Sequence, residues 1–150
     1  WNADAVRGRM EGGRAAGQPA SQADVLPSGA AFGGGMGRLR EGCGAVSGMF
    51  LTAGILYGYD DPGAREEKAV HYARIQELAK AFEEKNGSIV CRELLGLSVK
   101  REEPTPKERT AEYYKKRPCK ELVGDAAEIL EKYIAEHPVD ERLEKRGTVR

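Results

Sequence analysis

Three cysteines are the residues of this chain with the clearest chemical potential, and each falls where a helix is expected to begin. Cys43 stands in the segment REGCGAVSG, Cys91 in NGSIVCRELLG and Cys119 in KKRPCKELV. The N-terminus of a helix presents unpaired N–H groups and a positive dipole end, which lower the pKa of a nearby thiol. Because the thiolate binds metals and attacks disulfides, this placement predicts redox or metal chemistry.

The separation of the cysteines restricts the kind of site that they could form. It is far too long for a zinc finger or a C-x-x-C redox loop, and no C-x-x-C-H motif for covalent haem is present. An odd number also excludes a disulfide framework that uses all of them. One free cysteine most often packs in a core, but three at helix starts favour a shared site assembled by the fold.

A run of glycines at 33–37 precedes the first cysteine. It does not match a dinucleotide-binding fingerprint, because Arg38 stands where a further glycine is needed, and no Gly-Lys-Ser/Thr follows for a phosphate loop. The run predicts close backbone packing, or bare N–H groups at Gly35 and Gly37 that hydrogen-bond a cluster or a thiolate. Arg38 and Arg40 would add positive potential.

His71 and His137 are the only histidines of the chain. His71 is expected near the border of a buried helical face and His137 at a frayed helix end, so both are predicted to be structural or solvent-facing. No Ser/His/Asp arrangement and no hydrolase site are readable. Whether the protein is an enzyme is left open, because nothing beyond the cysteines indicates catalysis.

The composition indicates a small globular domain. A chain of 150 residues is long enough to bury a hydrophobic core without cross-links. Its 24 basic and 24 acidic residues give no net charge, and aromatic residues make up only 7%. Neither an electrostatic footprint for nucleic acid nor a stacking platform for bases is therefore expected.

The longest apolar stretch, 43–59, predicts a central helix rather than a membrane segment. It lies at the lower length limit of a membrane span, contains four glycines and has no tryptophan belt. No signal peptide pattern is visible. We therefore expect a cytoplasmic location, with an export signal that has already been removed as the alternative.

Helical periodicity dominates the chain and no segment alternates with period two, so the fold class is predicted to be all-α. We expect a single compact domain of about five or six helices, with a glycine-rich loop before the central helix. The predicted helices span 41–57, 62–85, 89–95, 105–116 and 118–137. Residues 1–31 form a poorly defined N-terminal segment, 32–137 the helical redox domain, and 138–150 a charged tail.

Helix starts and buried faces can also be predicted. Asp61 would be the N-cap of the helix at 62–85, and Thr105 would open a capping box for the helix at 105–116. The buried faces of the two longest helices are expected to hold Tyr72, Ile75, Leu78, Ala79 and Phe82, and Val123, Ala126, Ala127, Leu130 and Ile134.

Three blocks of the sequence resemble one family of small bacterial and archaeal proteins. They are FGGGMGRLREGCGAVSG, FEEKNGSIVCRELLG and CKELVGDAAEILEKY, which occur in the same order and cover about 32–136. The family is that of redox-active proteins with the C…GCAxxG…C…C cysteine pattern. It is related to the iron–sulfur domain of the split-Soret type of cytochrome.

The resemblance implies a site of four cysteines, of which Cys43, Cys91 and Cys119 match the last three. The first lies in an Asn-Cys-Ala-x-Ala-Val context, to which WNADAV at 1–6 is similar but one residue short. Either this protein has lost that thiol, or a residue is missing from the sequence after Asn2. The implied cofactor is an iron–sulfur cluster, most simply [2Fe–2S], for electron transfer or redox sensing. His71, a water or an exogenous ligand would then complete it.

Two alternatives remain open at this point. Two of the cysteines could cycle between dithiol and disulfide without a metal, or all three thiols could simply pack in a structural helical domain. For the redox functions we expect a redox partner protein whose identity the sequence does not give. We expect no nucleic acid and no membrane span, and a homodimer is compatible with the sequence.

Overall fold

The computed structural model describes residues 29–99, 101–106, 108, 110–115 and 117–139. Within this part the chain forms six helices and no strand, so the predicted all-α class is confirmed. The helices are α3 (Gly33–Met36), α4 (Gly44–Tyr57), α5 (Arg65–Asn86), α6 (Cys91–Leu94), α7 (Ala111–Lys115) and α8 (Cys119–Glu136).

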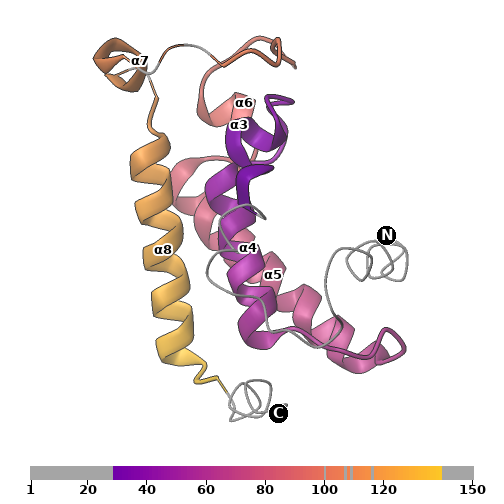
Figure 1. Ribbon diagram of the computed structural model, residues 1–150. Coiled ribbons are helices and arrows are strands. Elements are labelled where there is room, and N and C mark those ends of the chain that lie inside the picture. Colours follow the sequence, from indigo (N-terminus) through magenta and orange to yellow (C-terminus); the bar gives the residue numbers. More distant parts are fainter. Residues whose placement is uncertain (1–28, 100, 107, 109, 116, 140–150) are drawn as a thin grey trace, which may run out of the picture.

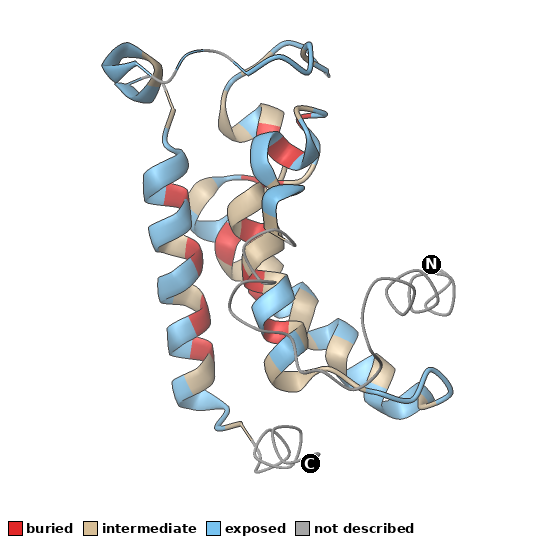
Figure 2. Ribbon diagram, viewed as in Figure 1, coloured by how far each residue is buried: buried red, intermediate tan, exposed pale blue. Residues whose placement is uncertain are grey.

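The three long helices α4, α5 and α8 pack against one another and enclose the core (Figure 1). Buried residues lie on the sides of these helices that face one another, whereas the outer sides are exposed (Figure 2). Ala53 of α4 and Phe82 of α5 are fully buried, and Leu78 is 1% exposed. The other apolar members of the core are Cys43, Val46, Met49, Leu122, Ala126, Leu130 and Tyr133.

The short helices gather at one end of this bundle. α3 and α6 lie beside the start of α4, and α7 precedes the start of α8 at the same end (Figure 1). An antiparallel bridge joins Gly42 to Val90 and ties the segment before α4 to the segment before α6. The starts of α4, α6 and α8 therefore share one end of the molecule.

Several helices begin later than the sequence predicts, because a local side chain either closes a turn before the helix or caps it further along the chain. α5 begins at Arg65 and not at Pro62, since the Asp61 carboxylate accepts a hydrogen bond of 2.7 Å from the Gly63 N–H and closes a turn. α7 begins at Ala111, where the Thr110 hydroxyl accepts a hydrogen bond of 3.2 Å from the Tyr113 N–H.

Two further starts move because the segments before α4 and α6 pair with each other. α4 begins at Gly44 rather than at 41, since the backbone at 41–43 pairs with that at 89–91. α6 is confined to four residues, and the Ser88 hydroxyl accepts a hydrogen bond from the Val90 N–H instead of capping a longer helix. The glycine run, predicted to be a loop, forms the single tight turn of α3.

The buried faces also differ from the predicted ones. Tyr72 of α5 is 55% exposed, and Val123 and Ala127 of α8 are both exposed. Leu122 and Tyr133 take the inward positions of α8 instead, beside the correctly predicted Ala126 and Leu130. None of the described helices combines the length and the apolar character that crossing a membrane would need.

Candidate functional site

All three cysteines line one cavity of about 500 Å³ at the end of the bundle where the short helices gather. Cys43 is the N-cap of α4, Cys91 is the first residue of α6 and Cys119 is the first residue of α8. The predicted position at helix starts is therefore confirmed for each of them. The fold brings together three thiols that are distant in the sequence.

Backbone pairing fixes Cys43 and Cys91 relative to each other. The N–H of Cys43 donates to the carbonyl of Ile89 at 2.9 Å, and the N–H of Cys91 donates to the carbonyl of Glu41 at 2.6 Å. This register places the two cysteines diagonally across the bridge, on the same face of the paired segments. Such diagonal positions have Cα atoms about 7–8 Å apart, which is slightly beyond the usual span of a disulfide.

A buried arginine lies beside the Cys91 thiol. Arg40 is 2% exposed, and its Nη1 is 3.9 Å from the Sγ of Cys91. The rest of its guanidinium forms an ion pair and a hydrogen bond with the Glu102 carboxylate. Burial lowers the pKa of Arg40, but its hydrogen bonds to Cys91 and Glu102 outweigh this effect and raise the pKa above its ordinary value.

Glycine is required where α3 touches the second cysteine. A Cβ atom on Gly35 would lie 2.5 Å from the Cβ and 2.8 Å from the Sγ of Cys91, and Gly35 has a φ of +68°. Gly37, the other glycine predicted to contact a cofactor, also has a positive φ but does not line the cavity. Gly33 and Gly34 do line it, so bare backbone forms this part of the wall.

Cys119 differs from the other two cysteines. It is exposed as a residue, whereas Cys43 is 7% and Cys91 8% exposed. Partial burial of its thiol at the cavity wall raises the pKa of Cys119, and the nearby Cys91 thiolate raises it further. The raised pKa of Cys119 is opposite to the lowering that its place at a helix start predicts.

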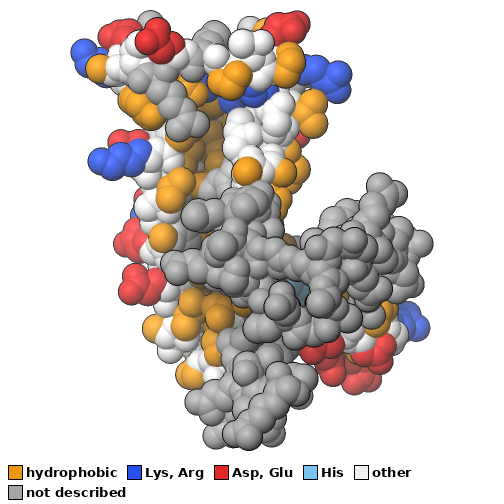
Figure 3. Space-filling view, viewed as in Figure 1, with side chains coloured by type: hydrophobic (Ala, Val, Ile, Leu, Met, Phe, Trp, Pro, Cys, Tyr) orange, Lys and Arg blue, Asp and Glu red, His pale blue; other side chains and the backbone are white. Residues whose placement is uncertain are grey.

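Apolar side chains cover much of the remaining wall. Leu94, Leu95 and Leu122 line the cavity together with the exposed Leu51 and Val123. In the space-filling view a hollowed strip of hydrophobic side chains runs between α8 and α4 below α3 (Figure 3). The cavity is thus a mainly apolar recess that is open at its rim.

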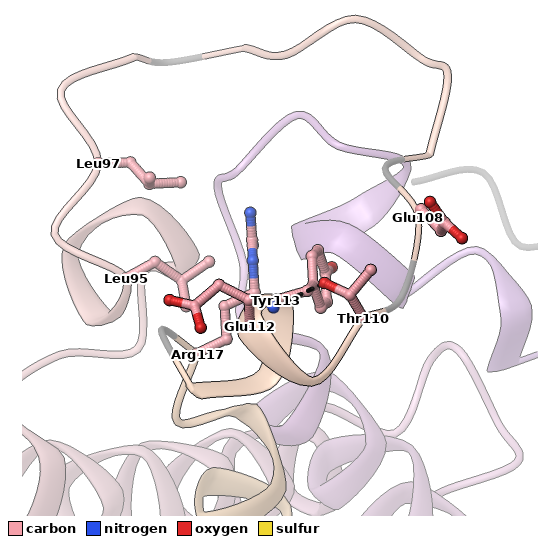
Figure 4. A pocket seen from close by; sticks show the side chains of 7 residues that line it. All are labelled: Leu95, Leu97, Glu108, Thr110, Glu112, Tyr113 and Arg117. Carbon is pink, nitrogen blue, oxygen red and sulfur yellow. Dashed lines mark hydrogen bonds between the residues drawn. The ribbon is translucent and has the colours of Figure 1, made fainter.

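A second cavity, of about 470 Å³, adjoins the cysteine cavity. Leu95, Tyr113 and Arg117 line both cavities, and the Arg117 guanidinium lies 4.6 Å from the centroid of the Tyr113 ring. Figure 4 shows Tyr113 and Thr110 beside each other on this wall, with Glu108 apart from them at the right of the view. Thr110, Tyr113 and Arg117 lie in a charged segment, and no periodic pattern there predicts that they line a cavity.

The structure does not bring His71 to the site. His71 is absent from the cavity wall and lies on α5, where its ring makes an edge contact of 6.0 Å with Tyr59. The expectation that His71 could complete a cluster is therefore wrong in this arrangement. Across the described residues, no three His, Cys, Asp or Glu side chains are close enough together to hold one metal ion.

Comparison with known proteins gives one result. The family model described as Putative redox-active protein (C_GCAxxG_C_C) matches residues 14–133. The match includes all three cysteines. It begins at residue 14, whereas the three sequence blocks begin at residue 32. The segment around Asn2, where the first family cysteine was expected, lies outside both the match and the described residues. No curated protein and no solved structure matches the chain significantly.

Proposed function

Because the chain belongs to the redox-active protein family with the C_GCAxxG_C_C cysteine pattern, we propose that it binds an iron–sulfur cluster for electron transfer or redox sensing. The observation that carries the proposal is the convergence of Cys43, Cys91 and Cys119 on one cavity. Cys43 and Cys91 are buried, and the buried Arg40 lies beside Cys91, a cation that simple packing of a thiol would not require.

The donor set fits such a cluster in part. Iron–sulfur clusters are ordinarily held by four thiolates, and this cavity offers three. Among the described residues no three His, Cys, Asp or Glu side chains could hold a single ion. The cofactor proposed is therefore a cluster of several atoms, [2Fe–2S] being the simplest. The fourth ligand would come from outside the described residues, from water or from an exogenous donor.

The residues around the thiols have definite tasks in this proposal. Arg40 provides positive charge beside Cys91, and the bare backbone at 33–35 allows close approach. Leu94 and Leu122 keep bulk water from the inner wall. A bound cluster would supply a one-electron redox couple, and the exposed Cys119 marks the side nearest to a partner.

Anaerobic purification of the full chain tests this function. We expect charge-transfer bands in the visible spectrum with iron and acid-labile sulfide in equal amounts. Each of the variants Cys43→Ser, Cys91→Ser and Cys119→Ser should lose most of both. The control Lys80→Ser introduces the same side chain at an exposed site on α5 and should keep both.

The metal-free alternative is a disulfide between Cys43 and Cys91, which the burial of both thiols on one face of the bridge favours. Their diagonal register opposes it, because the backbone would have to move to close the bond. Colourless protein with one reversible disulfide would support this alternative. Colourless protein without any redox change would support the other alternative, a structural helical domain whose thiols only pack.

A further inference from the structure

The buried Arg40 side chain places a positive charge beside the thiol of Cys91. An arginine that is only 2% exposed loses most of its hydration, and such a loss is costly unless charged partners replace the water. Arg40 has two partners of this kind: the Glu102 carboxylate and, at 3.9 Å, the sulfur of Cys91. The site therefore keeps a charge that is tied directly to a redox-active sulfur.

Glu102 holds this arginine in place from a distant part of the chain. Its carboxylate contacts both Arg40 and, at 3.5 Å, the Nη2 of Arg38. The backbone N–H of Glu102 also donates to the carbonyl of Arg38 at 3.2 Å, and the Arg38 side chain donates to the carbonyl of Glu103. The connection after α6 is thereby fastened to the loop that leads to Cys43.

The backbone of Arg40 is constrained as well. It has a φ of +62°, in the left-handed region that a residue with a side chain rarely adopts. Its carbonyl accepts a hydrogen bond of 2.9 Å from the N–H of Arg92, next to Cys91. The guanidinium is therefore aimed at Cys91 by a fixed backbone and by a carboxylate on its other side.

We propose that Arg40 sets the redox potential of the cysteine site and that Glu102 is its positioning residue and counter-charge. This inference rests on the proposed function. One electron enters the site from a low-potential donor such as a reduced viologen, so the site gains one negative charge while no bond forms or breaks. The positive charge of Arg40 stabilises that reduced state, and the negative charge of Glu102 partly offsets the effect.

The two residues should therefore shift the potential in opposite directions. Arg40→Gln removes the stabilising cation, so reduction becomes harder and the midpoint potential falls. Glu102→Gln leaves the cation without its counter-charge, so reduction becomes easier and the potential rises. We expect about a tenfold change in the reduction equilibrium for each variant, or about 59 mV for a one-electron couple.

The test is a redox titration of the cluster-loaded full chain, followed by its visible spectrum. Arg40→Gln leaves Glu102 without its main partner and could impair folding, so Arg40→Lys and the double variant Arg40→Gln/Glu102→Gln are measured beside it. Arg40→Lys keeps the charge and should stay closer to the wild type than Arg40→Gln. The double variant, which removes both charges, should fall between the two single neutral variants.

Arg74→Gln is the matched control. Arg74 is a partly buried cation that stacks on Tyr57 at the far end of α4, and its removal should leave the potential unchanged. A reversible couple with the same potential in all Arg40 and Glu102 variants would overturn this inference alone. Shifts in the same direction for Arg40→Gln and Glu102→Gln would do so too. A wild-type chain without any reversible couple would overturn the proposed function as well.

Discussion

Gly35 and Cys91 approach so closely that the geometry of the cavity depends on the absence of one side chain. A Cβ on Gly35 would meet the Cβ of Cys91 at 2.5 Å and the Cα of Arg40 at 3.1 Å. Neither neighbour is free to move, because Cys91 is held by the bridge and Arg40 by Glu102. The glycine is required by contact as well as by its φ.

Substitution of Gly35 should therefore cost more than substitution of Gly37. For Gly35→Ala we expect a loss of at least about 2 kcal/mol in the free energy of unfolding and a reduced cluster content. Gly37→Ala has a similar φ of +59° but open space around it, so only about 1 kcal/mol should be lost. Denaturant unfolding of both variants measures the difference, and equal losses would show that the contact with Cys91 is unimportant.

The exposure of the thiols predicts their order of reaction in the metal-free, reduced chain. A bulky maleimide should label the exposed Cys119 at least about tenfold faster than Cys43 or Cys91, because access limits the reaction of a buried thiol. Peptide mass spectrometry after timed labelling gives the three rates. Faster labelling of a buried cysteine would mean that the cavity opens in solution.

At the residue scale, the sequence identified the three cysteines, Gly35 and the charge of Arg40. It did not identify Glu102, because an ion pair between residues so distant in the chain leaves no periodic pattern. Nor could it show that Gly37 stays off the cavity wall. Positions that depend on a tertiary contact become visible only when the fold is known.

At the scale of elements, the face of α8 shows how a helical pattern can be assigned to the wrong side. Predicted and observed faces share Ala126 and Leu130, but Val123 points outward and Tyr133 inward. A prediction that counts only aliphatic side chains as buried overlooks Tyr133. Its hydroxyl accepts a hydrogen bond of 3.1 Å from the Arg74 Nε. This partly buried polar partner allows a tyrosine to take a core position.

The observed face can be checked with two truncations on α8. Leu130→Ala removes a side chain that is 9% exposed and should reduce the free energy of unfolding by about 2–4 kcal/mol. Val123→Ala, at a residue 57% exposed, should change it by less than about 0.5 kcal/mol. Thermal or denaturant unfolding gives both values, and the reverse order would restore the predicted face.

At the scale of the whole molecule, the two ends of the bundle have different tasks. The end with α3, α6 and α7 holds the thiols, whereas at the other end the Tyr57 ring of α4 makes an edge contact with the Tyr133 ring of α8. There, Arg74 lies over the Tyr57 ring, and Tyr133 stacks on His137 at 4.1 Å. The sequence predicted the helical class and one shared site, but only the fold separates these two ends.

His71 predicts a pH dependence of the free energy of unfolding that does not involve the thiols. Burial lowers the pKa of His71 in the folded protein, and the charge of Arg74 lowers it further. Its Nδ1 has no hydrogen-bond partner among the described residues. The folded state therefore prefers the neutral imidazole, whereas the unfolded chain takes up a proton near its ordinary pKa of about 6.5.

The sign of the effect follows from proton binding. Below about pH 7 the unfolded chain binds more protons at His71 than the folded chain, so the free energy of unfolding should fall as the pH decreases from 7.5 to 5.5. Urea unfolding of the reduced chain across this range measures the slope. His71→Gln cannot take up this proton and should flatten the slope while His137 remains. A slope that is unchanged in the variant would assign the pH dependence to other groups, because the partly buried ring beside Tyr59 would then accept a proton without cost.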